Sequence, residues 1–271
     1  MKKILILGAS GFIGNALYKE LCPYFDTHGT YYTDNAFFAK NQKFHQFDLE
    51  RESIGILLEN LRPTHIISAL RGNFDAQVAA HFGIIDYILR HKAKLIFLSS
   101  ANVFDAFTNY PSYEYDKTLS ESIYGRFKIK IENALLRLPN PRYVIGRVPM
   151  VYGHNSPRVL ELKRQLREKE PIEVFSNVVV NATSQAKLTQ QIHYIINRNR
   201  QGVFHLGSND LVHHNDLVAE ICKVLGEKDP LLKNVYDSNF DRFLAVLPKD
   251  NLLPKNLQIS VQDVVNSTHP A

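Results

Sequence analysis

The 271-residue sequence lacks tryptophan and holds only two cysteines and two methionines. Cys22 and Cys222 lie far apart in helix-like stretches. We therefore expect two buried free thiols in a reducing compartment, and neither a disulfide nor a metal site. No run of about 18 uncharged apolar residues occurs, which predicts no transmembrane helix. The first apolar run is too short for a signal peptide, so a cytoplasmic location is expected.

Motifs of several other protein classes are also missing. There is no G-x-S-x-G nucleophile motif and no Walker-type phosphate loop. The eleven histidines show no spacing with cysteine or acidic residues that is typical of a metal site. The net charge of +5 comes from scattered residues, so we expect no nucleic-acid partner. Its densest group, RVLELKRQLREKE (158–170), also holds glutamates, which favours a solvated helix over cations that bind a ligand phosphate.

A glycine-rich turn stands near the start, in KKILILGASGFIG (2–14). Apolar residues 4–7 predict a short strand, Gly8, Gly11 and Gly14 follow, and apolar residues at helical spacing predict a helix over 12–22. Glycines let the backbone approach a pyrophosphate, and a helix N-terminus attracts negative charge. The segment therefore favours a dinucleotide-binding unit over an ordinary turn.

Predicted strands and helices alternate along the first 150 residues. Strands are expected at 29–33, 43–49, 65–70, 94–100 and 142–148, and helices up to Leu61 and at 75–91 and 120–138. This rhythm predicts an α/β fold with a Rossmann-type, doubly wound parallel sheet. The pattern loosens after Pro149, with helices near 158–169, 185–198 and 214–226 and a strand at 202–207. We expect a dinucleotide-binding domain at 1–150. A mainly substrate-binding region at 151–271 is expected to pack on the sheet and return segments to it.

Two segments suggest carbonyl chemistry. YGRFK (124–128) places Tyr124 and Lys128 one turn apart on one helix face. An ammonium group beside a tyrosine favours the phenolate, so such a tyrosine can exchange a proton with a carbonyl oxygen while a cofactor moves hydride. LSSANVF (98–104) places Ser99 and Ser100 at a strand end, where a hydroxyl can bind a substrate carbonyl. An exposed helix pair and turn serines are the alternatives.

These motifs, in this order, resemble the extended short-chain dehydrogenases/reductases. The resemblance rests on GASGFIG, FDL (47–49), ISAL (67–70), LSSANVF, YGRFK and GRVPMVYG (146–153). It is strongest to the dTDP-4-dehydrorhamnose reductases within the NAD-dependent epimerase/dehydratase branch. It implies an NAD(P)-dependent oxidoreductase that transfers hydride to the carbonyl of a nucleotide-linked 4-keto-6-deoxy sugar.

The resemblance also implies roles for individual residues. Ser100 would hold the carbonyl oxygen, Tyr124 would donate the proton, and Lys128 would bind the nicotinamide ribose and tune Tyr124. The expected cofactor-binding residues are Gly8, Gly11, Phe12, Ile13, Gly14, Thr33, Asp48, Leu49, Ala69, Leu70, Tyr124, Lys128 and Val151.

Several features leave alternatives open. An acid that closes the second strand would bind the ribose 2′-hydroxyl of NAD, but Thr33 stands there and Asp34 follows. We slightly favour NADP over NAD. Ala101 stands where the rhamnose-type reductases have aspartate, and Arg71 extends the ISAL segment. A non-catalytic dinucleotide-binding regulator and a nucleotide-sugar epimerase remain alternatives, and the resemblance is compatible with a homodimer through 75–91 and 120–138.

Overall fold

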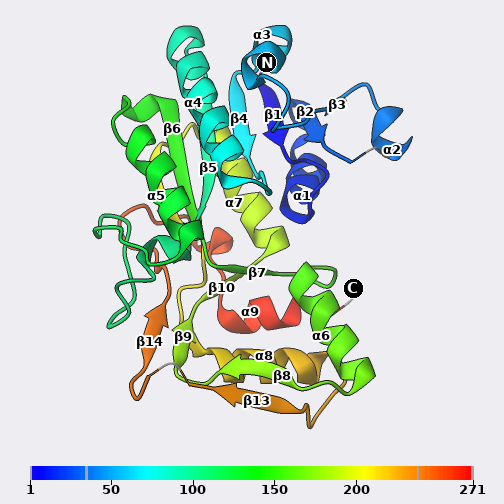
Figure 1. The fold of residues 1–271 in the computed structure, drawn as a ribbon, viewed down its shortest axis with the longest axis vertical. Coiled ribbons are helices and arrows are strands. Elements are labelled where there is room, and N and C mark those ends of the chain that lie inside the picture. The colour runs from blue at the N-terminus through cyan, green and yellow to red at the C-terminus, as the bar shows by residue number, and fades with distance from the viewer. Residues whose placement is uncertain (1, 34–35, 237, 270–271) are drawn as a thin grey trace. The chain divides into compact units, whose positions relative to one another are not determined.

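The computed structural model describes residues 2–33, 36–236 and 238–269. A seven-stranded parallel sheet has the order β11-β6-β5-β4-β1-β2-β3 (Figure 1). The strands are β1 (Lys3–Leu7), β2 (Asp26–Tyr31), β3 (Phe44–Gln46), β4 (His65–Ser68), β5 (Lys94–Ser100), β6 (Tyr143–Val148) and β11 (Gly202–His205). The strand order reverses between β1 and β4, which is the point where doubly wound sheets bind their ligands. The predicted fold class is confirmed.

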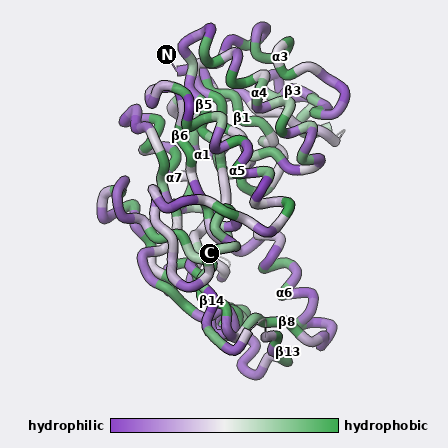
Figure 2. The backbone as a smooth tube through the Cα atoms, turned by 60° about the vertical axis from the view of Figure 1, so that its left-hand side comes forward, coloured by the Kyte–Doolittle hydropathy of each residue, from purple (hydrophilic) through white to green (hydrophobic). Residues whose placement is uncertain are grey.

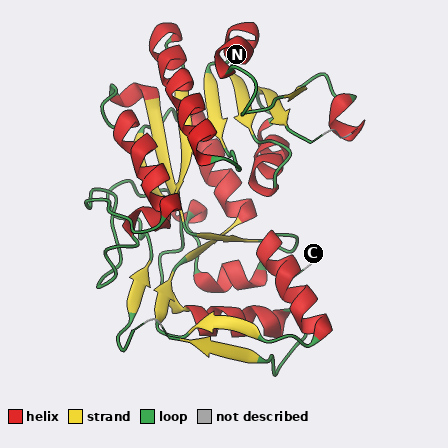
Figure 3. Ribbon diagram, in the orientation of Figure 1, coloured by secondary structure: helices red, strands yellow, loops and turns green. Residues whose placement is uncertain are grey.

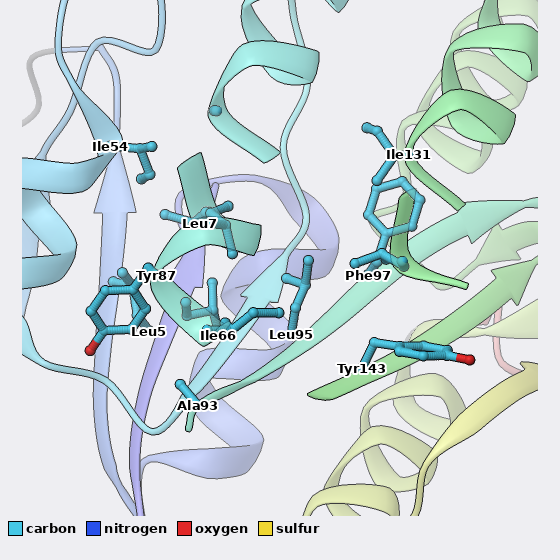
Figure 4. Close-up of a cluster of buried hydrophobic side chains, with 14 of the residues drawn as sticks. Leu5, Leu7, Ile54, Ile66, Tyr87, Ala93, Leu95, Phe97, Ile131 and Tyr143 are labelled. Atoms are coloured by element: carbon cyan, nitrogen blue, oxygen red, sulfur yellow. The ribbon is translucent and has the colours of Figure 1, made fainter. Parts of the chain in front are cut away.

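Helices cover both faces of this sheet. Alternate strand residues point to opposite faces. Leu5 and Leu7 of β1 join a cluster with the apolar stripes of α3 (Ile54–Leu61), α4 (Phe74–His91) and α5 (Ile123–Leu135). Figure 4 shows part of this cluster, in which Leu5 lies near Tyr87 of α4 and Ile66 lies beside Leu95 of the neighbouring strand. Ile4 and Ile6 face the other way, on the side where α1 (Phe12–Leu21) packs.

The chain divides into two compact units. The first comprises Met1–Ser99, Arg126–Gly146 and Ile192–Val203, and the second comprises Ser100–Gly125, Arg147–Gln191 and Phe204–Ala271. The first unit has 18 lysine and arginine residues against 10 aspartate and glutamate residues, a net charge of +8. The second has 14 against 17, a net charge of −3. The basic excess therefore belongs to the unit that contains most of the seven-stranded sheet.

Three small sheets form the second unit (Figure 3). β7 (Met150–Tyr152) pairs with β10 (Ala182–Ser184), β8 (Ile172–Phe175) with β13 (Leu232–Val235), and β9 (Val178–Val180) with both β12 (Val212–His213) and β14 (Arg242–Leu244). An apolar cluster joins them to α6 (Pro157–Glu168), α8 (His214–Val224) and α9 (Val261–Asn266). The remaining elements are α2 (Ala36–Ala39), α7 (Gln185–Asn197), η1 (Ala101–Phe104), η2 (Asn140–Arg142) and η3 (Lys255–Leu257).

The basic run at 158–170 folds as α6, a helix with many hydrophilic positions (Figure 2). Ser156 caps its start by accepting a hydrogen bond from Val159 N–H, and Pro157 occupies its first turn. Arg164 forms ion pairs with Glu161, Glu168 and Glu170. These pairs match the expected solvated helix. The less favoured alternative, in which Arg158, Lys163, Arg164 or Arg167 binds a ligand phosphate, stays a prediction.

Two details differ from expectation. Cys22 is exposed because α1 ends one residue before it, so the predicted burial of both thiols is wrong, although Cys222 is buried and both are free. The second strand ends at Tyr31 and not at Thr33. In the ranges that the structure describes, no helix is long and apolar enough to cross a bilayer. Those ranges also hold no grouping of three potential metal ligands.

Candidate active site

Two glycines of the first turn are required by packing. Gly8 has a φ of +80°, and a Cβ atom built on it would lie 2.7 Å from the carbonyl oxygen of Ala69. A Cβ atom on Gly14 would lie only 2.1 Å from the carbonyl oxygen of Gly8. The first glycine thus permits a turn that side chains disfavour, and the third lets α1 pack closely on it. The turn lies against the end of β4, at the reversal of strand order.

Neither packing nor backbone conformation requires glycine at position 11. Its φ of −78° is ordinary, and a Cβ atom would lie 3.4 Å from the Gly8 carbonyl oxygen, which is normal van der Waals contact. Gly11 caps α1 without a side-chain hydrogen bond, and the first turn holds no acidic residue. A helix start with no side-chain cap and no acidic residue in its first turn fits an anionic group that approaches the backbone from outside. The residues present therefore fit a dinucleotide pyrophosphate.

Several of the other expected cofactor residues lie in the first unit, after its strands or at the start of α1. Ala69 and Leu70 follow β4 beside Gly8, and Phe12 and Ile13 begin α1. Phe47 N–H donates to Tyr31 O at 2.9 Å, which brings the ends of β2 and β3 together, next to Asp48.

Asp48 and Thr33 differ in their surroundings. The Asp48 carboxylate accepts a hydrogen bond from Glu50 N–H at 2.9 Å and lies 3.5 Å from Arg51 Nε. Leu49 packs against the apolar cluster of the sheet. Thr33 is exposed, two residues beyond the end of β2, and Asp34 lies outside the described residues.

Lys128 lies inside the first unit, on α5. Its side chain is buried, and Nζ donates a hydrogen bond to Leu98 O at 2.9 Å. Nζ also lies 4.6 Å from the centre of the Phe97 ring. Burial lowers the pKa of Lys128 to about 8, and Glu132, one turn further along α5, acts in the opposite direction. These contacts hold the Lys128 ammonium group in a fixed position beside α5.

Tyr124 and Ser100 belong to the second unit. Tyr124 precedes Lys128 by one turn of α5 and is 39% exposed. Ser100 ends β5 and begins η1. Its hydroxyl donates to Asn102 Oδ1 at 3.0 Å and accepts from Asn102 N–H at 3.2 Å. The tyrosine is therefore accessible, whereas the serine is largely buried and held by Asn102.

Gly125 joins the start of α5 to η1. A Cβ atom on it would lie 2.0 Å from Ser120 Oγ and 2.3 Å from Asn102 O. Ser120 Oγ in turn donates to Asp105 Oδ2 at 2.9 Å. Tyr124 is thus placed next to the turn that carries Ser100. The sequence reasoning missed Gly125, although a glycine inside a helical pattern often marks close packing.

A buried polar cluster in the second unit supports η1 and also went unpredicted. The Arg147 guanidinium donates to Glu114 O at 2.9 Å and lies 3.3 Å from His205 Nε2. It also lies 4.8 Å from the ring centre of Phe104 in η1. Burial lowers the pKa of His205 to about 3, with Arg147 acting in the same direction. Val151 lies elsewhere in this unit, in β7, opposite Thr183 of β10.

Comparison with known proteins adds to this geometry. The family model of the RmlD substrate binding domain matches residues 71–254, more than half of the chain. The β subunit of methionine adenosyltransferase 2 from Rattus norvegicus is 26% identical over 251 residues, which cover 87% of this chain and 66% of that protein. A dTDP-4-keto-6-deoxy-D-glucose reductase from Streptomyces niveus is 26% identical over 196 residues, 67% of this chain and 68% of that protein.

Solved structures show the same fold. A dTDP-4-dehydrorhamnose reductase from Bacillus anthracis, in complex with NADP, superposes with a TM-score of 0.77 at 19% identity, and 98% of each chain is covered. Nucleotide-sugar dehydratases and epimerases are among the other proteins with this fold.

Proposed function

The chain belongs to the family of the RmlD substrate binding domain, and we propose that it is an NAD(P)-dependent reductase that transfers hydride to the carbonyl of a nucleotide-linked 4-keto-6-deoxy sugar. The observation that carries this proposal is a buried lysine, Lys128, one helical turn from the exposed Tyr124. Burying an ammonium group costs free energy. A role for its charge in the reaction accounts for a lysine at this buried position.

In this proposal Tyr124, Lys128 and Ser100 each have a separate role in the reaction. A bound dinucleotide would supply the hydride. Tyr124 would give its phenolic proton to the carbonyl oxygen as charge develops there. Lys128, held by Leu98 O, would stabilise the phenolate that remains. Ser100 would turn its hydroxyl proton from Asn102 to the same oxygen and so fix the position of the carbonyl.

The turn at Gly8, Gly11 and Gly14 would hold the dinucleotide. We favour NADP because the first unit carries a net charge of +8, which attracts a third phosphate group. Thr33, exposed beyond β2, leaves space there for the 2′-phosphate.

A non-catalytic dinucleotide-binding regulator is the second candidate. The similarity to methionine adenosyltransferase 2 subunit beta favours it. Such a protein would bind NADP(H) at the glycine turn and contact a partner enzyme, without need of a proton donor at Tyr124.

We further propose a cytoplasmic location and a homodimer. Exposed Phe82 and Leu89 on α4 would form the apolar part of the dimer interface. Asp86 on α4 and Lys130 on α5 would supply opposite charges at its rim.

Loss of nicotinamide absorbance tests the function. The purified chain is mixed with NADPH or NADH and a panel of nucleotide-linked 4-keto sugars, with Tyr124→Phe as the matched control. Turnover that is lost in the control supports the reductase and identifies the cofactor. Cofactor binding without turnover, together with capture of an enzyme by this chain, supports the regulator. Sugar conversion without net cofactor consumption indicates an epimerase.

A further inference from the structure

A buried polar network in the first unit holds the β4–α4 loop, residues 69–73. The loop begins directly after Ser68, the last residue of β4, and ends at Asn73, which caps α4. Its start lies against the glycine turn, where Leu70 Cα would be 3.4 Å from a Cβ atom on Gly8. This loop therefore borders the site that we assign to the dinucleotide.

One histidine of α4 connects the network. His81 is 1% exposed, and its Nε2 lies 2.9 Å from Ser68 Oγ. Its Nδ1 lies 2.6 Å from Gln77 O. A carbonyl oxygen only accepts, so Nδ1 carries the proton and Nε2 accepts from the Ser68 hydroxyl. Burial lowers the pKa of His81 to about 4, which keeps this neutral form near neutral pH.

The same network reaches the far end of the loop. Gln77, also buried, donates from Nε2 to Gly72 O at 3.0 Å. Gly72 has a φ of +107°, a conformation that glycine adopts readily, and this hydrogen bond fixes the position of its carbonyl group. The loop is thus tied at Ser68 and at Gly72, and both ties pass through one turn of α4.

His81 also lies beside the lysine of the proposed site. Its ring meets the Phe97 ring edge to face, with centres 5.0 Å apart. Lys128 Nζ lies 4.6 Å from the centre of the same ring. Phe97 is fully buried, so a change at His81 reaches Lys128 through a packed contact.

We propose that His81 is a positioning residue for dinucleotide binding, acting through Ser68 and Gln77 on residues 69–73 and through Phe97 on Lys128. This inference rests on the proposed function. In this proposal α4 positions the β4–α4 loop, a role that no motif in the sequence indicates. His81 contacts neither cofactor nor substrate and acts only through these neighbours.

The test compares three single variants and the double variant Ser68→Ala/His81→Phe. Ser68→Ala removes one hydrogen bond, and His81→Phe keeps a ring against Phe97 but removes both. His65→Phe is the matched control, since His65 is also buried, in the same strand as Ser68 but at its start, and burial lowers its pKa to about 4 as well. Each is compared with wild type at a temperature where all remain folded.

Two readouts decide the proposal. The first readout is amide hydrogen exchange at Ala69, Asp75 and Ala76, whose N–H groups are hydrogen-bonded. Exchange should become about tenfold faster in Ser68→Ala and His81→Phe, because the loss of one hydrogen bond changes the equilibrium of local opening by about that factor. NADPH affinity should fall about three- to tenfold in the same two variants, by the same reasoning. His65→Phe should change neither. The double variant should lose no more than His81→Phe alone, because both changes remove the same bond.

Unchanged exchange in both variants would overturn the proposal, as would faster exchange with unchanged NADPH affinity. Equal effects from His65→Phe would show a general loss of stability and would also overturn it. If wild type binds neither NADPH nor NADH, the proposed function fails, and with it the role in dinucleotide binding. Exchange then still shows whether His81 holds the loop.

Discussion

Replacement of Gly11 by alanine should separate dinucleotide binding from folding. A methyl group there meets only the Gly8 carbonyl oxygen, at 3.4 Å, so packing tolerates it. Alanine is a poorer helix N-cap than glycine, and we expect a loss of about 0.5–1 kcal/mol in the free energy of unfolding. The methyl group would, however, stand where a pyrophosphate approaches the start of α1.

The binding loss is larger than the folding loss. Displacing the pyrophosphate weakens at least one hydrogen bond to a charged group, worth about 1.5–3 kcal/mol, so NADPH affinity should fall about ten- to hundredfold. Gly14→Ala should act differently. Its methyl group would overlap the Gly8 carbonyl oxygen at 2.1 Å, and such overpacking costs about 1–3 kcal/mol of stability or more.

Urea unfolding and NADPH fluorescence titration measure the two quantities separately. Gly55→Ala is the control, because its methyl group would meet only Ser53 Oγ at 3.5 Å, on α3. It should raise stability by about 0.5–1 kcal/mol and leave affinity unchanged. Wild-type NADPH affinity in Gly11→Ala, or a loss of affinity that only follows the loss of stability, would show that no pyrophosphate binds at this turn.

Two further changes follow from the structure. Between pH 7 and pH 5.5 the chain should lose about 4 kcal/mol of stability. Burial lowers the pKa of His65 and His81 to about 4 and of His205 to about 3, so in this range the unfolded chain takes up protons that the folded chain does not. Equal urea midpoints at the two pH values would contradict this. Gly125→Ala should cost about 1–3 kcal/mol, since its methyl group would overlap Ser120 Oγ and Asn102 O. It should also slow turnover by displacing Tyr124 from Ser100, and wild-type turnover by the folded variant would exclude that positioning.

Much of the fold is predictable because the strands of a parallel sheet are continuous apolar runs. Ile66 and Ile67, or Leu95–Leu98, have no polar alternation that would suggest an exposed face. The second strand is harder to place. Its residues DTHGTY (26–31) are mostly polar, so the sequence predicts a strand at 29–33. The strand in fact begins at Asp26 and ends at Tyr31.

The candidate site is predictable where one motif lies within one element. Tyr124 and Lys128 share α5, and the three glycines share one turn, so spacing alone relates them. Gly125, Arg147 and His81 act through residues far away in the chain, such as Asn102, Glu114 and Ser68. Periodicity carries no information on such contacts, and a lone buried histidine gives no sequence signal.

Transfer of deuterium from NADPH to the sugar tests directly whether the protein is a reductase. NADPH that carries deuterium at the transferred position is incubated with the chain and a nucleotide-linked 4-keto sugar, and the product is analysed by mass spectrometry and NMR. We expect one deuterium at the former carbonyl carbon with wild type, and a strongly reduced yield with Tyr124→Phe. A reduced sugar without deuterium at that carbon, or equal yields from the two proteins, would contradict hydride transfer assisted by Tyr124.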